Sequence, residues 1–124
     1  MNDNDMTSAG WLSLPEVAEA IGVELRDVRS MVRESRLAGV RRGESNAYAV
    51  PAEFIRTKEE DPEEPGPLPA LRGTLITLGD SGYSEEEAVR WLLRPDDTLG
   101  VPPVQALRAG QIHAVRRIAQ ALAF

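Results

Sequence analysis

"LPEVAEAIGVELRDVRSMVRESRL", residues 14–37, decides the fold, because it predicts two short helices separated by a glycine. Ser13 and Glu16 form the capping-box pattern that begins a helix, and apolar residues then recur at helical spacing up to Ile21. Gly22 ends this helix after about two turns. A second helix is predicted over residues 24–37, and such a pair is typical of a helix-turn-helix.

The second predicted helix has a basic face and an apolar face. The apolar face consists of Leu25, Val28, Met31 and Val32. At about 100° per residue, four arginines fall in a narrow arc largely opposite that face, namely Arg26, Arg29, Arg33 and Arg36. Ser30 lies beside the arc, whereas Asp27 and Glu34 share another flank. Because the second helix of a helix-turn-helix enters the major groove, we predict that the four arginines and Ser30 contact DNA. A merely solvated basic face is the alternative.

"LAGVRRGESNAYAV", residues 37–50, follows directly and contains two short runs separated by turn-forming residues. This pattern predicts a β-hairpin, and a hairpin after a recognition helix is a wing. Arg41 and Arg42 would then meet phosphates beside the groove, contacts that supply affinity but little sequence information. A short helical turn is predicted next, in which Phe54 and Ile55 close over the small core.

Charge is distributed unevenly along the chain. The formal net charge is -6, which by itself argues against a nucleic-acid partner. However, six arginines accompany only three acidic residues between Val23 and Arg42, whereas residues 58–66 hold one lysine and five acidic residues. The acidity is therefore concentrated away from the predicted recognition helix and wing, and the distribution of charge is compatible with DNA binding.

We predict a mainly α fold with a small β-hairpin wing, in which a winged helix-turn-helix precedes a C-terminal helical bundle. The expected divisions are a disordered tail at 1–10, the winged helix-turn-helix at 11–57, an acidic proline-rich linker at 58–66 and an all-helical domain at 67–124. The linker assignment rests on its prolines and acidic residues, which bury little surface.

The C-terminal segment carries its own helix signals. An apolar face is formed by Leu68, Leu71, Leu75 and Leu78. Ser84 and Glu87 make a second capping box, a proline-started helix is expected to end at Gly110, and a last helix is expected from about Gln111. These elements predict a bundle of short helices.

Several classes of function are disfavoured by composition. The chain has no cysteine, so disulfides and thiolate metal sites are excluded. It also has no run of about eighteen apolar residues and no secretory signal, so we expect a cytoplasmic protein without membrane contact. No catalytic motif is present, and we predict neither an enzyme nor a cofactor. The single histidine, His113, is expected to be an ordinary surface or interface residue rather than a metal ligand.

Residues 14–55 resemble the winged helix-turn-helix of excisionase- and MerR-like DNA-binding proteins. With "LITLGDSGYSEEEAVRWLLRPDDTLG" and "PVQALRAGQIHAVRRIAQALAF", the chain from Leu14 onward resembles a family of small actinobacterial DNA-binding proteins whose mycobacterial member is a substrate of a membrane-anchored Ser/Thr protein kinase, kinase L. The resemblance implies double-stranded DNA as partner and phosphorylation of the N-terminal tail by such a kinase. Thr7 is the candidate phosphorylation site by position, and an unmodified tail is the alternative.

A second resemblance leaves another function open. "DDTLGVPPVQALRAGQIHAVRRIAQAL", residues 96–122, is similar to the end of the toxin-binding domain of Xre/MbcA/ParS-type antitoxins. Such a domain binds a partner protein, so an antitoxin-like or adaptor protein is the alternative to a transcriptional regulator. For the regulator, one winged helix of this size reads few base pairs, which is compatible with a homodimer on DNA, but no coiled-coil heptad indicates one and the sequence leaves the oligomeric state open.

Overall fold

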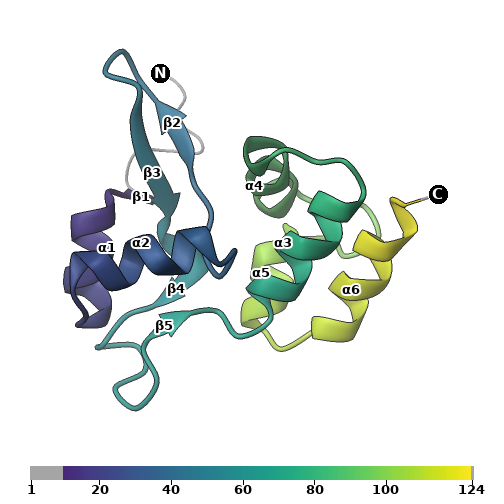
Figure 1. Cartoon of the computed structure of the whole chain (residues 1–124). Helices are drawn as coiled ribbons and strands as arrows, with labels where there is room; N and C mark the ends of the chain where they lie inside the picture. The colour runs from purple at the N-terminus through teal and green to yellow at the C-terminus, as the bar shows by residue number, and fades with distance from the viewer. Residues whose placement is uncertain (1–9, 124) are drawn as a thin grey trace.

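Helix α1 (Leu14–Ile21) begins and ends at the residues that the capping pattern predicted. The Ser13 hydroxyl accepts a hydrogen bond from the Glu16 backbone N–H at 3.2 Å, and the Glu16 carboxylate accepts one from the Ser13 N–H at 2.7 Å. Gly22 follows with φ 79°, a left-handed conformation that glycine adopts without steric cost. The computed structural model that shows this describes residues 10–123 (Figure 1).

Helix α2 (Leu25–Arg33) packs against α1 and completes the helix-turn-helix. Val28 and Met31 are buried against the first helix, and Leu25 and Val32 are half-buried at the edge of the same face. The predicted apolar face is therefore confirmed, although the helix is shorter than the 24–37 that we expected.

A three-stranded sheet contains the predicted wing. Strand β2 (Val40–Arg42) pairs antiparallel with β3 (Ala47–Pro51), and the turn between them uses Gly43 and Asn46 at positive φ. A strand that the sequence did not predict, β1 (Trp11–Leu12), pairs with the other edge of β3, giving the order β1-β3-β2. The hairpin projects from the helix-turn-helix as a two-stranded ribbon (Figure 1).

The middle of the chain forms a second, smaller sheet. After the 3₁₀ turn η3 (Ala52–Phe54), strand β4 (Ile55–Arg56) pairs with β5 (Gly66–Pro67). The acidic segment 58–66 thus leaves and returns at the same small sheet. Phe54 and Ile55 are fully buried, as predicted.

Four helices make the C-terminal half: α3 (Leu71–Asp80), α4 (Glu85–Leu93), α5 (Pro103–Arg108) and α6 (Ile112–Ala121). Helix α3 contacts α4 and α6, while α5 contacts α4 and α6. The capping box at Ser84 is present as predicted. The mainly α fold with a small wing is confirmed.

The two halves share their interior. The buried apolar residues of the described chain form one cluster that extends from Val17 and Phe54 in the first half to Leu71, Leu92 and Val115 in the second. Their side chains are mostly aliphatic, and burial of such side chains is the main favourable contribution to folding. Within residues 10–123, no helix has the length and apolar character needed to cross a bilayer.

Candidate nucleic-acid interface

The solvent-facing side of α2 carries three arginines. Arg26, Arg29 and Arg33 are all exposed, while Val28 and Met31 on the opposite side of the helix are buried. Ser30 is half-buried between them. The division of this helix into a basic side and an apolar side follows from the sequence spacing and is confirmed by the burial of its residues.

Few of these guanidinium groups are neutralised within the protein. Arg26 Nε lies 3.4 Å from Glu24 Oε1, but both side chains are highly exposed, at 83% and 71%, so that solvent screens this pair. Arg33 Nη2 donates to the Ser30 hydroxyl at 2.8 Å. No carboxylate of residues 10–123 forms an ion pair with Arg29 or Arg33. The basic side of α2 is therefore open to an anionic partner.

Two of the acidic residues near α2, Glu24 and Asp27, lie at the start of the helix, whereas Glu34 follows its last residue. The Asp27 carboxylate accepts a hydrogen bond from the Glu24 N–H at 3.2 Å, and Glu24 pairs with Arg26. Carboxylates are favoured at a helix N-terminus because they satisfy free N–H groups and complement the helix dipole. They do not cover the exposed side of Arg29 and Arg33.

Arg36 is not on the recognition helix, which corrects our expectation. The helix ends at Arg33, and Ser35 adopts the left-handed conformation with φ 63°. The Arg36 N–H then bonds to the Met31 carbonyl at 2.8 Å and the Ser35 N–H to the Val32 carbonyl at 3.1 Å, which is a Schellman ending. This turn brings the next residue, Leu37, into the core. Arg36 remains exposed, but in the loop after the helix.

The two wing arginines lie on opposite faces of the ribbon, because successive residues of a strand alternate. Arg41 is paired across the strands with Tyr48, lies 5.8 Å from the centre of that ring, and donates to the Asn46 carbonyl at 3.2 Å. Arg42 is half-buried and stacks on the indole of Trp11 in β1 at 4.3 Å. Each guanidinium thus lies over an aromatic ring, and the two guanidinium groups lie on opposite faces of the wing.

The first residue of α4 fixes the base of the wing. Glu85 Oε2 accepts hydrogen bonds from the Gly39 N–H, at 3.0 Å, and from the Tyr48 hydroxyl. Burial raises the pKa of Tyr48 well above its ordinary value, and the bond to Glu85 raises this pKa further. Gly39 has no room for a larger residue, since a Cβ there would lie 2.3 Å from the Ala49 carbonyl oxygen. The start of β2 is therefore held in one position against α4.

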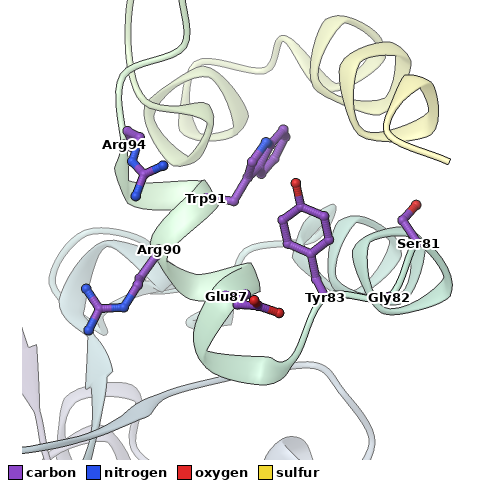
Figure 2. A pocket seen from close by; sticks show the side chains of 7 residues that line it. All are labelled: Ser81, Gly82, Tyr83, Glu87, Arg90, Trp91 and Arg94. Atoms are coloured by element: carbon purple, nitrogen blue, oxygen red, sulfur yellow. The ribbon is translucent and has the colours of Figure 1, made fainter. Parts of the chain in front are cut away.

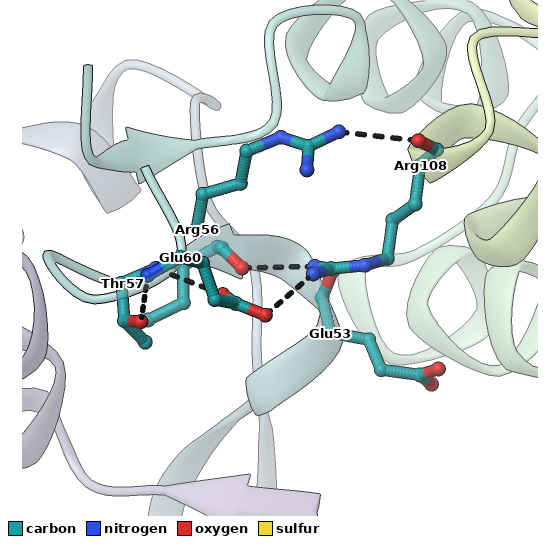
Figure 3. Close-up of polar contacts among 6 residues, drawn as sticks. Glu53, Arg56, Thr57, Glu60 and Arg108 are labelled. Carbon is teal, nitrogen blue, oxygen red and sulfur yellow. Dashed lines mark hydrogen bonds and ion pairs between the residues drawn. The ribbon is translucent and has the colours of Figure 1, made fainter. Parts of the chain in front are cut away.

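Another contact between the halves is centred on Arg108, at the end of α5 (Figure 3). Its Nη1 donates to the carbonyls of Glu53 and Ile55 at 2.8 and 2.9 Å, and its Nη2 lies 3.0 Å from Glu60 Oε2. Arg56 Nη2 in turn donates to the Arg108 carbonyl at 3.1 Å. The Thr57 N–H and the nearby Arg108 both lower the pKa of Glu60.

These contacts between the halves could not be predicted from the sequence. Arg72, the second residue of α3, donates its Nε–H to the Glu34 carbonyl at the end of α2, at 3.0 Å. Arg72, Glu85 and Arg108 are separated from their partners by tens of residues, and no local periodicity connects such positions. Only the alternation of Arg41 and Arg42 could have been anticipated from strand geometry.

A pocket of about 410 Å³ lies at α4 and the turn that precedes it, and no residue of α2 lines it. Its lining includes Tyr83, Trp91, Arg90 and Arg94. Figure 2 shows the Tyr83 and Trp91 rings on one side of α4, with Arg90 and Arg94 on the other. Arg90 is bonded to Glu86 at 2.8 Å. Aromatic rings beside arginines are characteristic of protein contact surfaces.

His113 is exposed on α6, and among residues 10–123 no three histidine, aspartate or glutamate side chains gather as potential metal ligands. Thr7, the phosphorylation candidate, lies outside the described residues.

Comparison with known proteins agrees with both halves of the structure. A family model described as "DNA-binding protein Rv2175c, wHTH domain" matches residues 3–55, and one described as "Rv2175c C-terminal domain of unknown function" matches residues 68–123. The DNA-binding protein Rv2175c of Mycobacterium tuberculosis is 34% identical over 123 residues, which cover 90% of this chain and 79% of the relative. The NMR structure of Rv2175c superposes with a TM-score of 0.76 at 33% identity, covering 92% of this chain and 81% of that one.

Both domains, their order and the arrangement of their elements are thus shared with one characterised relative. The winged helix-turn-helix and the helical C-terminal half that the sequence predicted are the two domains of this family. The chain therefore belongs to the Rv2175c family of winged helix-turn-helix proteins.

Proposed function

We propose that this protein binds double-stranded DNA through α2 and the wing and acts as a transcriptional regulator. The observation that carries the proposal is the exposed basic side of α2, where Arg26, Arg29 and Arg33 lie opposite the buried face. The name of its relative, a DNA-binding protein, supports the same function. A short basic helix set on a helix-turn-helix has the shape that the major groove admits.

The geometry supports a division of roles among the predicted contact residues. The N-terminal residues of a recognition helix reach base edges, which assigns that role to Arg26 and Arg29, and Ser30 beside them would contact a base edge or a phosphate. Arg33 would contact phosphates near the end of the helix. Three more arginines would also contact phosphates: Arg36 from the loop after α2, and Arg41 and Arg42 from the wing.

A genome-wide binding map, combined with a gel shift of the recovered fragments at two salt concentrations, tests the proposal. We expect discrete bound sites and a steep loss of affinity as salt rises, because phosphate contacts release counterions. Measuring the protein-to-duplex ratio in the shifted complex tests for a homodimer. A protein that retains no duplex at low salt would refute DNA binding.

Phosphorylation of the tail would regulate this binding. Thr7 precedes Trp11 by four residues, and four residues of extended chain span at most about 14 Å. Trp11 carries the Arg42 guanidinium on its ring. Added negative charge so close to the wing would repel DNA. We expect Thr7→Glu to bind DNA more weakly than Thr7→Val, and equal affinities would argue against this regulation.

The adaptor function has one observation in its favour, the pocket beside Tyr83 and Trp91. If a protein partner binds there, crosslinks from α4 to that partner should disappear in Trp91→Ala while DNA binding is kept. Crosslinks that persist in this variant would place any such partner elsewhere.

A further inference from the structure

The C-terminal half places an arginine at the end of the recognition helix. Arg72, near the start of α3, is exposed and donates its Nε–H to the carbonyl oxygen of Glu34, the residue that follows Arg33. Figure 1 shows the end of α2 directed towards the start of α3. The Arg72 guanidinium is thereby fixed at the point where the basic side of α2 ends.

Most of this guanidinium remains available. An arginine has five N–H donors, and within residues 10–123 the hydrogen bond recorded for Arg72 uses Nε alone. No carboxylate of the described residues forms an ion pair with Arg72. The group is therefore positioned by one bond while its Nη atoms stay free, and such prior positioning lowers the entropy lost when a ligand binds.

The position has an electrostatic consequence. The C-terminal end of a helix carries partial negative charge from its unpaired carbonyl groups, and this charge repels a phosphate that approaches the end of α2. Arg72 bonds directly to one of these carbonyls and places a positive charge beside it. It thereby adds a positive charge at the end of α2, beside the residue that follows Arg33.

We propose that Arg72 contacts a DNA phosphate at the end of α2, so that the C-terminal half forms part of the DNA-binding surface. This inference rests on the proposed function, DNA binding through α2. It gives the C-terminal half a direct role on the duplex, in addition to its packing against the wing.

The test compares three single variants of the full chain by fluorescence anisotropy on a random-sequence duplex from 0.05 to 0.2 M salt. Arg72→Gln removes the charge. Arg72→Lys keeps the charge but lacks the Nε donor that bonds to Glu34. Arg117→Gln removes an equal charge from the exposed side of α6, on the far side of the C-terminal half (Figure 1). Thermal unfolding of each variant verifies that it is folded.

One phosphate contact contributes about 0.9 to the slope of log affinity against log salt, and its contribution to the affinity is taken as zero at 1 M salt. Arg72→Gln should therefore bind about 15-fold more weakly at 0.05 M and about 4-fold more weakly at 0.2 M. Arg72→Lys should keep the wild-type slope, and Arg117→Gln should change neither affinity nor slope.

Different failures have different meanings. If Arg72→Gln keeps the wild-type slope, or if Arg72→Lys loses it equally, Arg72 only caps α2 and the inference is wrong. In that case the proposed function still stands, provided that the wild type binds DNA and substitution of arginines on α2 weakens it. If the wild type binds no duplex, both proposals are overturned.

Discussion

Replacing both Arg29 and Arg33 with alanine should remove most of the DNA affinity and leave the fold intact. Both side chains are exposed, and no described carboxylate pairs with either, so the change leaves no carboxylate without its partner. The bond from Arg33 to the Ser30 hydroxyl is exposed and contributes little to stability. Since alanine has the highest helix propensity, we expect an unchanged or slightly higher melting temperature.

The size of the effect follows from the two charges removed. Arg29 in the groove and Arg33 at the phosphates each bring one positive charge to the duplex, and if each displaces counterions as one phosphate contact does, the slope of log affinity against log salt falls by about 1.8. If the variant and the wild type have equal affinity at 1 M salt, the variant binds about 200-fold more weakly than the wild type at 0.05 M and about 20-fold more weakly at 0.2 M. The loss at the lower salt corresponds to about 3 kcal/mol, which lies within the range expected for two arginine contacts.

Fluorescence anisotropy with a labelled duplex at four salt concentrations measures both the affinity and the slope. The matched control is Arg116→Ala with Arg117→Ala, which removes the same charge from exposed positions of α6. This control should bind as the wild type does. The reasoning is refuted if the folded α2 variant keeps its affinity within twofold and its salt slope unchanged, or if the α6 control loses as much.

Three further predictions concern the contacts that hold the halves together. Arg108→Met removes the bonds to the Glu53 and Ile55 carbonyls and should lower the free energy of unfolding by about 2–4 kcal/mol, measured by urea denaturation; a change below about 0.5 kcal/mol would show that these bonds are replaced by water. Glu85→Ala leaves the buried Gly39 N–H without its partner and should cost about 1–3 kcal/mol, visible as a lower melting temperature. Because the pKa of Tyr48 is raised in the fold, its neutral form stabilises the protein fully below pH 10, the ordinary tyrosine value, and this stabilisation is lost as the pH rises above it. Tyr48→Phe should therefore lose less stability than the wild type between pH 9 and 11.5 in thermal melts, and parallel curves would contradict this assignment.

Local signals in the sequence were sufficient for most of the first half. The capping box at Ser13, the left-handed Gly22 and the turn at Gly43 each act within a few residues, and each was found where it was predicted. The apolar faces of both helices followed from a period of 3.6 residues. These features need no knowledge of distant contacts, and for this reason the helix-turn-helix and its wing could be predicted.

Other features depend on residues far apart in the chain. The end of α2 was missed because Ser35 adopts a positive φ that serine rarely takes, and the burial of Leu37 imposes this turn. Strand β1 has only two residues, and its pairing with β3 carries no local pattern. The exposed side of α2 was predictable, whereas the position of Arg72 beside it required the packing of α3.

The wing is held at both of its edges. Strand β1 pairs with β3 on one side, and Glu85 of α4 accepts a hydrogen bond from the Gly39 N–H at the start of β2 on the other. A wing that is held at both edges keeps its conformation before DNA binds. DNA therefore meets a preorganised surface and does not have to reshape it. A substitution of Glu85 at the start of α4 would then change the angle of the wing, and with it the DNA sequences that the protein prefers, through a residue whose bonds are to the wing.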